Sequence, residues 1–183
     1  MPRPHGDGSS TAELFRTADR GRSWPRPAAT LLLLVVALAV GGCKRNNTPV
    51  PDGDVAAALA LPSVGAHTFD PESLKGKPSL IMFVTPTCPH CIATIPRGAA
   101  AAAAQGANVV AVFVAGNKAN AEGVVSHAKF PGTALIDDGT LKRKYNIRAV
   151  PYSVVLGADG HAKEAFRGEQ EESTFREALA DAK

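Results

Sequence analysis

Short apolar runs, separated by turn-forming residues, dominate the chain after residue 61. Two continuous apolar runs, Ser79–Val84 (SLIMFV) and 108–114 (NVVAVFV), are typical of strands that are buried on both faces of a sheet. Further along, Tyr152–Leu156 (YSVVL) and 161–166 flank a short Gly-containing turn, which predicts an antiparallel hairpin. A shorter run, Thr133–Ile136, predicts one more strand.

The longest helical pattern follows the first of these strands. It begins after Cys88, with Pro89 in the first turn, where the fixed φ and missing N–H of proline do no harm. The pattern continues through an alanine-rich stretch to Ala104, and alanine is the best helix former. Gly106 then ends the helix.

The remaining pattern predicts three further helical segments. They are 119–129, 141–145 and 171–182. The middle segment is polar enough for an exposed helical turn, and Asp137 and Asp138 before it are expected in a solvated turn. Strands and helices that alternate and then give way to a hairpin and a helix predict an α/β fold, with a central mixed sheet flanked by helices.

The first 42 residues have a different pattern. Residues 28–40 (AATLLLLVVALAV) carry no charge, follow four arginines and precede Gly41-Gly42-Cys43, which is the arrangement of an export signal. At about 1.5 Å per residue, a helix of this length spans roughly 20 Å, less than the bilayer core of about 30 Å. Including the glycines lengthens the run, so an uncleaved membrane anchor is the alternative.

Cys43 ends this apolar run and is followed by polar residues 44–47. Val40-Gly41-Gly42-Cys43 resembles a bacterial lipobox, in which the cysteine is lipidated and becomes the mature N-terminus. We therefore expect a lipoprotein-type signal peptide over 1–42, a lipidated N-terminus with a flexible tether over 43–61, and a folded domain over 62–183. As a flexible coil the tether would reach on the order of 20–25 Å.

Charge argues against a nucleic-acid partner. The formal net charge is +3, and after residue 42 fifteen basic side chains stand against fourteen acidic ones. No basic stripe is present along the chain. The electrostatic signature of a nucleic-acid-binding protein is therefore missing.

Candidate chemistry centres on Cys88 and Cys91, which form a C-P-H-C motif at the predicted start of the long helix. Unpaired N–H groups and the helix dipole stabilise a thiolate at that point. His90 can add a positive charge or a hydrogen-bond donor to the same sulfur, and it is expected to tune the pair together with Pro89 and Thr87. Cys91 lies one turn further in and is expected to be more buried, which gives one sulfur that is attacked and one that resolves.

Other uses of the two sulfurs have less support. A dedicated metal site would need further ligands, and the chain has no second CxxC and no histidines at motif spacing. An inert disulfide would close a very small loop, which stabilises least. A redox pair is the leading hypothesis, because exported thiols are not held reduced. A Cu(I)-binding module built from Cys88, Cys91 and His90 and a redox-inert lipoprotein stay open as alternatives.

A second motif supports the redox interpretation. Val150-Pro151 stands at the head of a predicted strand some 60 residues after the cysteines. In this order the pair resembles the cis-proline loop of the thioredoxin superfamily. The resemblance implies a cis peptide bond at Pro151 that prevents metal binding, and a backbone at Val150 that pairs with the substrate.

From about Leu61 to its end, the chain resembles membrane-tethered thioredoxin-like proteins of the TlpA/ResA type. The matching segments are Leu74-Lys75-Gly76-Lys77-Pro78, C-P-H-C, Pro96, Tyr145-Asn146-Ile147 and Gly157-Ala158-Asp159-Gly160. The Pro89-His90 dipeptide, with Val150-Pro151, instead resembles the DsbA type of periplasmic disulfide oxidase. The resemblance implies a thioredoxin-like fold and a thiol–disulfide oxidoreductase with Cys88 and Cys91 as catalytic residues and no cofactor.

Three positions depart from these patterns. Thr87 stands where thioredoxins have Trp, and Met82 occupies the strand position of their buried Asp. Thr94 stands where TlpA/ResA relatives carry Glu. No matching carboxylate is therefore available to shuttle the proton of Cys91. C-P-H-C favours an oxidant and the TlpA/ResA-like scaffold favours a reductase, so the direction stays open.

The predicted export signal and the resemblance together imply a location outside the cytoplasm. We expect a membrane-anchored lipoprotein, in the periplasm if the organism is Gram-negative, held by the lipid on Cys43. The expected partners are protein thiol or disulfide substrates and a membrane redox partner.

Overall fold

A computed structural model describes residues 48–183, and its elements follow the predicted order. The strands are β1 (Ser79–Val84), β2 (Asn108–Phe113), β3 (Thr133–Ile136), β4 (Tyr152–Leu156) and β5 (Ala162–Arg167). The helices are α2 (Val55–Ala58), the 3-10 helix η1 (Pro71–Leu74), α3 (Pro89–Gln105), α4 (Lys118–His127), α5 (Thr140–Lys144) and α6 (Glu172–Asp181). Every predicted strand and helix of this part is present, and α2 and η1 are additional.

The five strands form one mixed sheet in the order β3-β2-β1-β4-β5. Strands β1, β2 and β3 run parallel, whereas β4 pairs antiparallel with both β1 and β5. The register places Met82 of β1 between Ala111 of β2 and Ser153 of β4. The predicted central mixed sheet is confirmed.

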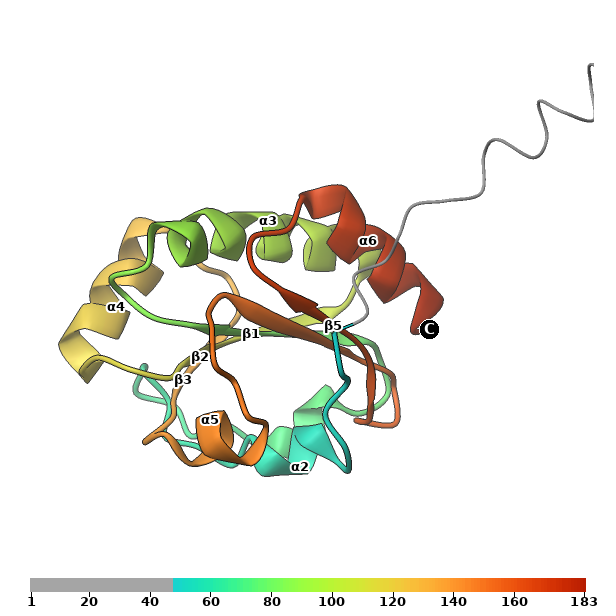
Figure 1. Ribbon diagram of the computed structural model, residues 1–183, viewed down its shortest axis with the longest axis horizontal. Coiled ribbons are helices and arrows are strands. Elements are labelled where there is room, and N and C mark those ends of the chain that lie inside the picture. The colour runs from blue at the N-terminus through green and yellow to red at the C-terminus, as the bar shows by residue number, and fades with distance from the viewer. Residues whose placement is uncertain (1–47) are drawn as a thin grey trace, which may run out of the picture. The chain divides into compact units, whose positions relative to one another are not determined.

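Helices cover both faces of this sheet. Figure 1 shows α3, α4 and α6 on one face and α2 and α5 on the other. Successive side chains of a strand point to opposite faces, so Leu80, Met82 and Val84 of β1 pack toward α3 and α6. Ile81 and Phe83 pack into the second core, toward α2 and α5. All five are fully buried, which explains why this strand has no polar position between its ends.

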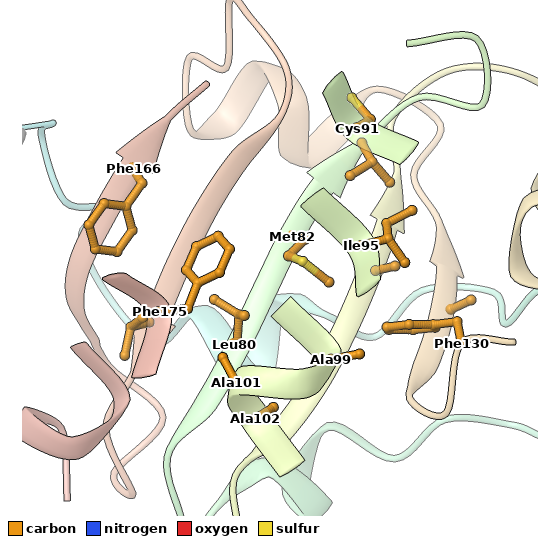
Figure 2. Close-up of a cluster of buried hydrophobic side chains, with 14 of the residues drawn as sticks. Leu80, Met82, Cys91, Ile95, Ala99, Ala101, Ala102, Phe130, Phe166 and Phe175 are labelled. Atoms are coloured by element: carbon orange, nitrogen blue, oxygen red, sulfur yellow. The ribbon is translucent and has the colours of Figure 1, made fainter. Parts of the chain in front are cut away.

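The close approach of α3 to β1 fixes the position of the cysteines. Figure 2 shows the alanines of α3 beside Leu80 and Met82, with Cys91 at one end of the cluster. Gly98 permits this approach, because a Cβ there would lie 2.5 Å from Met82 Sδ. The helix ends at Gly106, whose φ of 63° lies in the left-handed region that glycine adopts without strain. The predicted end of the helix at this glycine is confirmed.

The tether predicted over 43–61 is wrong in its last part. Val55 and Leu59 are fully buried in the core on the α2 side of the sheet. The amide of Ala56 donates to the carbonyl of Gly160, in the turn of the β4–β5 hairpin, at 3.2 Å. Alanine-rich sequence with few large apolar residues gives little sign of burial, which here depends on contacts with distant segments. The folded domain therefore begins before the predicted boundary.

The prediction of a solvated turn is wrong for Asp137 and right for Asp138, which is exposed. Asp137 is only 4% exposed, and its carboxylate accepts from the amides of Leu141 and Lys142, each at 3.0 Å. The first N–H groups of a helix have no partner within the helix, so a buried carboxylate satisfies two of them at the start of α5.

None of the helices within residues 48–183 is long and apolar enough to cross a bilayer. The apolar run 28–40, Cys43 and the first part of the predicted tether lie outside the described residues.

Candidate active site

Cys88 lies at the junction between β1 and α3 and is the N-cap of that helix. Its sulfur accepts a hydrogen bond from the backbone amide of Cys91 at 3.2 Å. The sulfur thus occupies the end of the helix where N–H groups converge and where the dipole favours negative charge. Cys88 is half-buried, so its sulfur remains open to a reactant.

Cys91 lies one helical turn further into α3 and is fully buried. Burial, and secondarily the hydrogen bond with the Cys88 thiol, raises the pKa of Cys91 to about 12, although hydrogen bonds with Thr85 act in the opposite direction. Both cysteines are free thiols in this structure. The predicted difference in burial between the two sulfurs is confirmed.

The peptide bond between Val150 and Pro151 is cis, as expected from the resemblance. The carbonyl oxygen of Val150 lies 3.9 Å from Cys88 Sγ, although 62 residues separate the two along the chain. Val150 also packs against the cluster that contains Cys91. The structure therefore brings both predicted motifs together at one end of the sheet.

Three residues were predicted to tune the cysteines, and each has a different environment in the structure. Pro89 is exposed in the first turn of α3, and the side chain of His90 is 73% exposed. Thr87 lines a groove of about 520 Å³ beside the cysteines, between the β1–α3 loop and α4. Other residues that line this groove include Ile92 and Val124.

The exposed imidazole of His90 contacts a carboxylate from a distant part of the chain. Its Nδ1 lies 2.7 Å from Oε2 of Glu169, in the loop between β5 and α6. The other carboxylate oxygen of Glu169 accepts from Nη1 of Arg97 at 2.6 Å. First the hydrogen bond with His90, and then the charge of Arg97, hold the pKa of Glu169 below its usual range.

Glu169 and Arg97 were not predicted from the sequence to lie at this site. Arg97 gave a local signal, because it lies seven residues after His90, or two turns along the same face of α3. Glu169 gave none, since its contact with His90 spans 79 residues and depends on where β5 ends.

Few polar side chains are buried in the part of the chain that the structure describes. Within residues 48–183 the buried polar side chains are Ser79, Thr94, Asp137 and Ser153. Asp137 caps α5, and the hydroxyl of Thr94 donates to the carbonyl of His90 at 2.8 Å. No group of three or more histidine, cysteine or acidic side chains in this part of the chain is arranged to hold a metal ion.

Comparisons with known proteins identify a family. A family described as a thioredoxin-like domain matches residues 72–183. The methylamine utilization protein MauD of Methylobacillus flagellatus is 32% identical over 85 residues, which span 46% of this chain and 41% of MauD. The soluble secreted antigen MPT53 of Mycobacterium tuberculosis is 36% identical over 117 residues, which span 62% of this chain and 68% of MPT53. The chain thus matches less than half the length of MauD.

Solved structures show the same fold. A secreted Mycobacterium tuberculosis disulfide oxidoreductase, described as homologous to Escherichia coli DsbE, superposes with a TM-score of 0.63 at 27% identity. That superposition covers 70% of this chain and 99% of the other. A thiol:disulfide interchange protein from Chlorobium tepidum superposes with a TM-score of 0.61 at 22% identity, covering 75% of this chain and 98% of the other. The predicted thioredoxin-like fold is confirmed.

Proposed function

Because the chain belongs to the thioredoxin-like domain family, we propose that it is a thiol–disulfide oxidoreductase whose redox pair is Cys88 and Cys91. One observation carries the proposal. A half-buried sulfur caps a helix, accepts the amide of a buried partner cysteine at 3.2 Å and lies 3.9 Å from a carbonyl next to a cis-proline. This arrangement gives one accessible sulfur and one sheltered sulfur, as stepwise exchange requires.

In the oxidising direction the pair begins as a disulfide. A substrate thiolate attacks Cys88 Sγ, the Cys88–Cys91 bond breaks, and Cys91 leaves as a thiolate that takes up a proton. A second substrate thiolate then attacks the substrate sulfur of the mixed disulfide, and Cys88 leaves as a thiolate. The substrate has gained a disulfide, and the protein has gained two electrons.

In the reducing direction the same steps run backward. The Cys88 thiolate attacks a substrate disulfide and expels one substrate thiolate. Cys91 must then lose its proton and attack Cys88 Sγ to release the second substrate sulfur. The raised pKa of Cys91 makes this step the difficult one, and no buried carboxylate of the described residues lies free to accept the proton.

The residues around the pair have supporting roles in this proposal. The backbone at Val150 and Pro151 would hold an extended substrate segment beside Cys88 Sγ, which the 3.9 Å separation supports. Pro89, His90 and Thr87 would tune the reactivity of Cys88 or contact the substrate around it.

We place this activity outside the cytoplasm, on protein thiols or disulfides, with a lipid on Cys43 as anchor and a membrane redox partner that restores the pair. MPT53 is described as secreted, and so is the superposed DsbE homologue, which supports the location. Incorporation of labelled fatty acid into the chain tests the anchor. A Cys43→Ser variant should lose the label, and equal labelling of both proteins would contradict the anchor.

Trapping of the mixed disulfide tests the activity. In a Cys91→Ser variant the second step of reduction is blocked, so a disulfide substrate should remain attached to Cys88 and dissociate on addition of dithiothreitol. A Cys88→Ser variant retains Cys91 and serves as the control, because its remaining sulfur is buried. Equal trapping by both variants, or trapping by neither, would contradict the assigned roles.

A further inference from the structure

We infer that the groove between the β1–α3 loop and α4 receives an apolar side chain of the protein substrate, next to the substrate sulfur that reacts with Cys88. The inference rests on the proposed function and names the kind of substrate segment that the site favours. The groove has a volume of about 520 Å³. It lies where α4 comes beside the first turns of α3 (Figure 1).

The groove adjoins the residue that carries the accessible sulfur. Its lining includes Thr87, which directly precedes Cys88 in the chain. The lining also includes Ile92, whose amide donates to the carbonyl of Cys88 at 3.1 Å, one helical turn further along α3. A substrate whose sulfur approaches Cys88 Sγ therefore brings the side chains next to its own cysteine within reach of this groove.

The lining of the groove suits an uncharged, apolar group. Its apolar members include Pro86, Ile92 and Val124, and His127 is the one ionisable side chain among the described residues that line it. A charged substrate side chain would find no lysine, arginine or carboxylate partner there. An apolar side chain would instead be removed from water, which is favourable in proportion to the area that is buried.

The charged groups near the cysteines lie on another side of α3. His90 and Arg97 contact the carboxylate of Glu169, and none of the three lines the groove. His90 and Ile92 are two residues apart in α3, so their side chains project from roughly opposite sides of the helix. The environment of Cys88 is thus ionic toward the β5–α6 loop and uncharged toward α4.

Gly123 gives the groove additional room. It lies inside α4, where glycine is less favourable than alanine, and its φ is not in the left-handed region. Packing does not require it either, because a Cβ at Gly123 would meet no atom within 4 Å, whereas a Cβ at Gly98 would lie 2.5 Å from Met82 Sδ. The missing side chain therefore leaves space along the α4 wall of the groove.

Competing peptide disulfides test the inference. In a full chain that carries Cys43→Ser and Cys91→Ser, Cys88 is the only thiol. Its thiolate attacks a disulfide-linked peptide dimer, forms a mixed disulfide with one peptide and expels the other as a thiolate, which takes up a proton. Two dimers are compared, one with leucine and one with serine on both sides of the cysteine. Mass measurement follows the rate at which each mixed disulfide forms.

Each rate constant is divided by that of the same dimer with free glutathione, which removes differences in intrinsic reactivity. On this scale the leucine dimer should react about three- to tenfold faster than the serine dimer, because an open groove buries only part of each apolar side chain. Val124→Asn places an amide in the groove and should reduce this preference to about twofold or less.

Val125→Asn is the matched control. Val125 is the next residue of α4 and is also half-buried, but it lines a separate cavity of about 420 Å³. The preference for leucine should persist in this variant. Equal rates for the two dimers without any change in α4 would overturn the inference, and so would a preference that survives Val124→Asn or is lost equally in Val125→Asn. If Cys88 reacts with neither dimer, the proposed function itself fails.

Discussion

At the scale of single residues, the two cysteines differ because one caps α3 and the other lies inside its first turn. The amide of Cys91 donates to the sulfur of Cys88, whereas Cys91 itself is enclosed by apolar side chains such as Ile95 and Met82. The same short motif therefore supplies an accessible sulfur and a thiol that stays protonated at neutral pH.

The raised pKa of Cys91 predicts a pH dependence of stability. The folded protein holds this thiol at a pKa of about 12, whereas a thiol in an unfolded chain titrates near about 8.5. Above about pH 8.5 the unfolded state releases this proton first. The free energy of unfolding of the reduced protein should therefore be unaffected below that pH and fall as pH rises toward 12, by at most about 1.4 kcal/mol per pH unit.

Denaturant unfolding of the reduced protein between pH 7 and pH 11 measures this effect. Burial also raises the pKa of Tyr145 and of Tyr152, so these tyrosines lower the stability at high pH as well. A Cys91→Ala variant keeps both tyrosines, and its difference from the unmodified protein therefore isolates the contribution of Cys91. Cys91→Ala should lose less stability over this range. If stability falls equally with pH in the two proteins, the pKa of Cys91 in the folded protein is not raised.

Asp137 predicts a second effect at this scale. Asp137→Ala leaves the amides of Leu141 and Lys142 without their carboxylate partner in a buried setting, so it should lower the free energy of unfolding by about 1–3 kcal/mol. Asp138→Ala is the control, because Asp138 is exposed and hydrogen-bonds with Thr140, so its loss should lower the free energy of unfolding by less than the loss of Asp137 does. Equal losses on urea denaturation would contradict the buried cap.

At the scale of elements, α2 joins the predicted tether to the folded domain. Leu59→Ala removes a fully buried side chain and should lower the free energy of unfolding by about 2–4 kcal/mol. Val50→Ala is the control, because Val50 is 38% exposed and its truncation should change stability by no more than about 0.5 kcal/mol. If thermal unfolding shows no difference between the two, the region up to α2 is a tether after all.

Most elements could be predicted from local pattern, whereas α2 and η1 could not. Strands β1 and β2 have continuous apolar runs, and α3 has proline near its start and Gly106 at its end. The residues of α2 pack in a core formed with distant segments, and Ala56 donates to the carbonyl of Gly160, more than 100 residues away. The role of Asp137 depends on the sheet that buries it. Both features depend on tertiary contacts, which a local sequence pattern does not reveal.

At the scale of the whole molecule, the sheet brings together segments that the sequence separates widely. The pairing of β1 with β4 places Val150 beside Cys88, which the order of the two motifs could predict through resemblance. The end of β5 places Glu169 beside His90, which no motif could predict. The candidate site was thus predictable for its sulfurs and its cis-proline, and not for the charges around them.

The direction of electron flow is also a property of the whole molecule, because it depends on the potential of the pair against that of its partners. A value near about −120 mV would make this protein a disulfide donor. A value at or below about −250 mV would make it a reductase that receives electrons from a membrane partner.

Equilibration of the purified full chain with mixtures of reduced and oxidised glutathione tests the central claim most directly. Alkylation of the remaining thiols and mass measurement would follow the state of Cys88 and Cys91. The account predicts one reversible two-electron transition that joins Cys88 to Cys91 and is abolished by Cys88→Ser. Thiols that stay free across the whole range, or a disulfide that no mixture reduces, would contradict it.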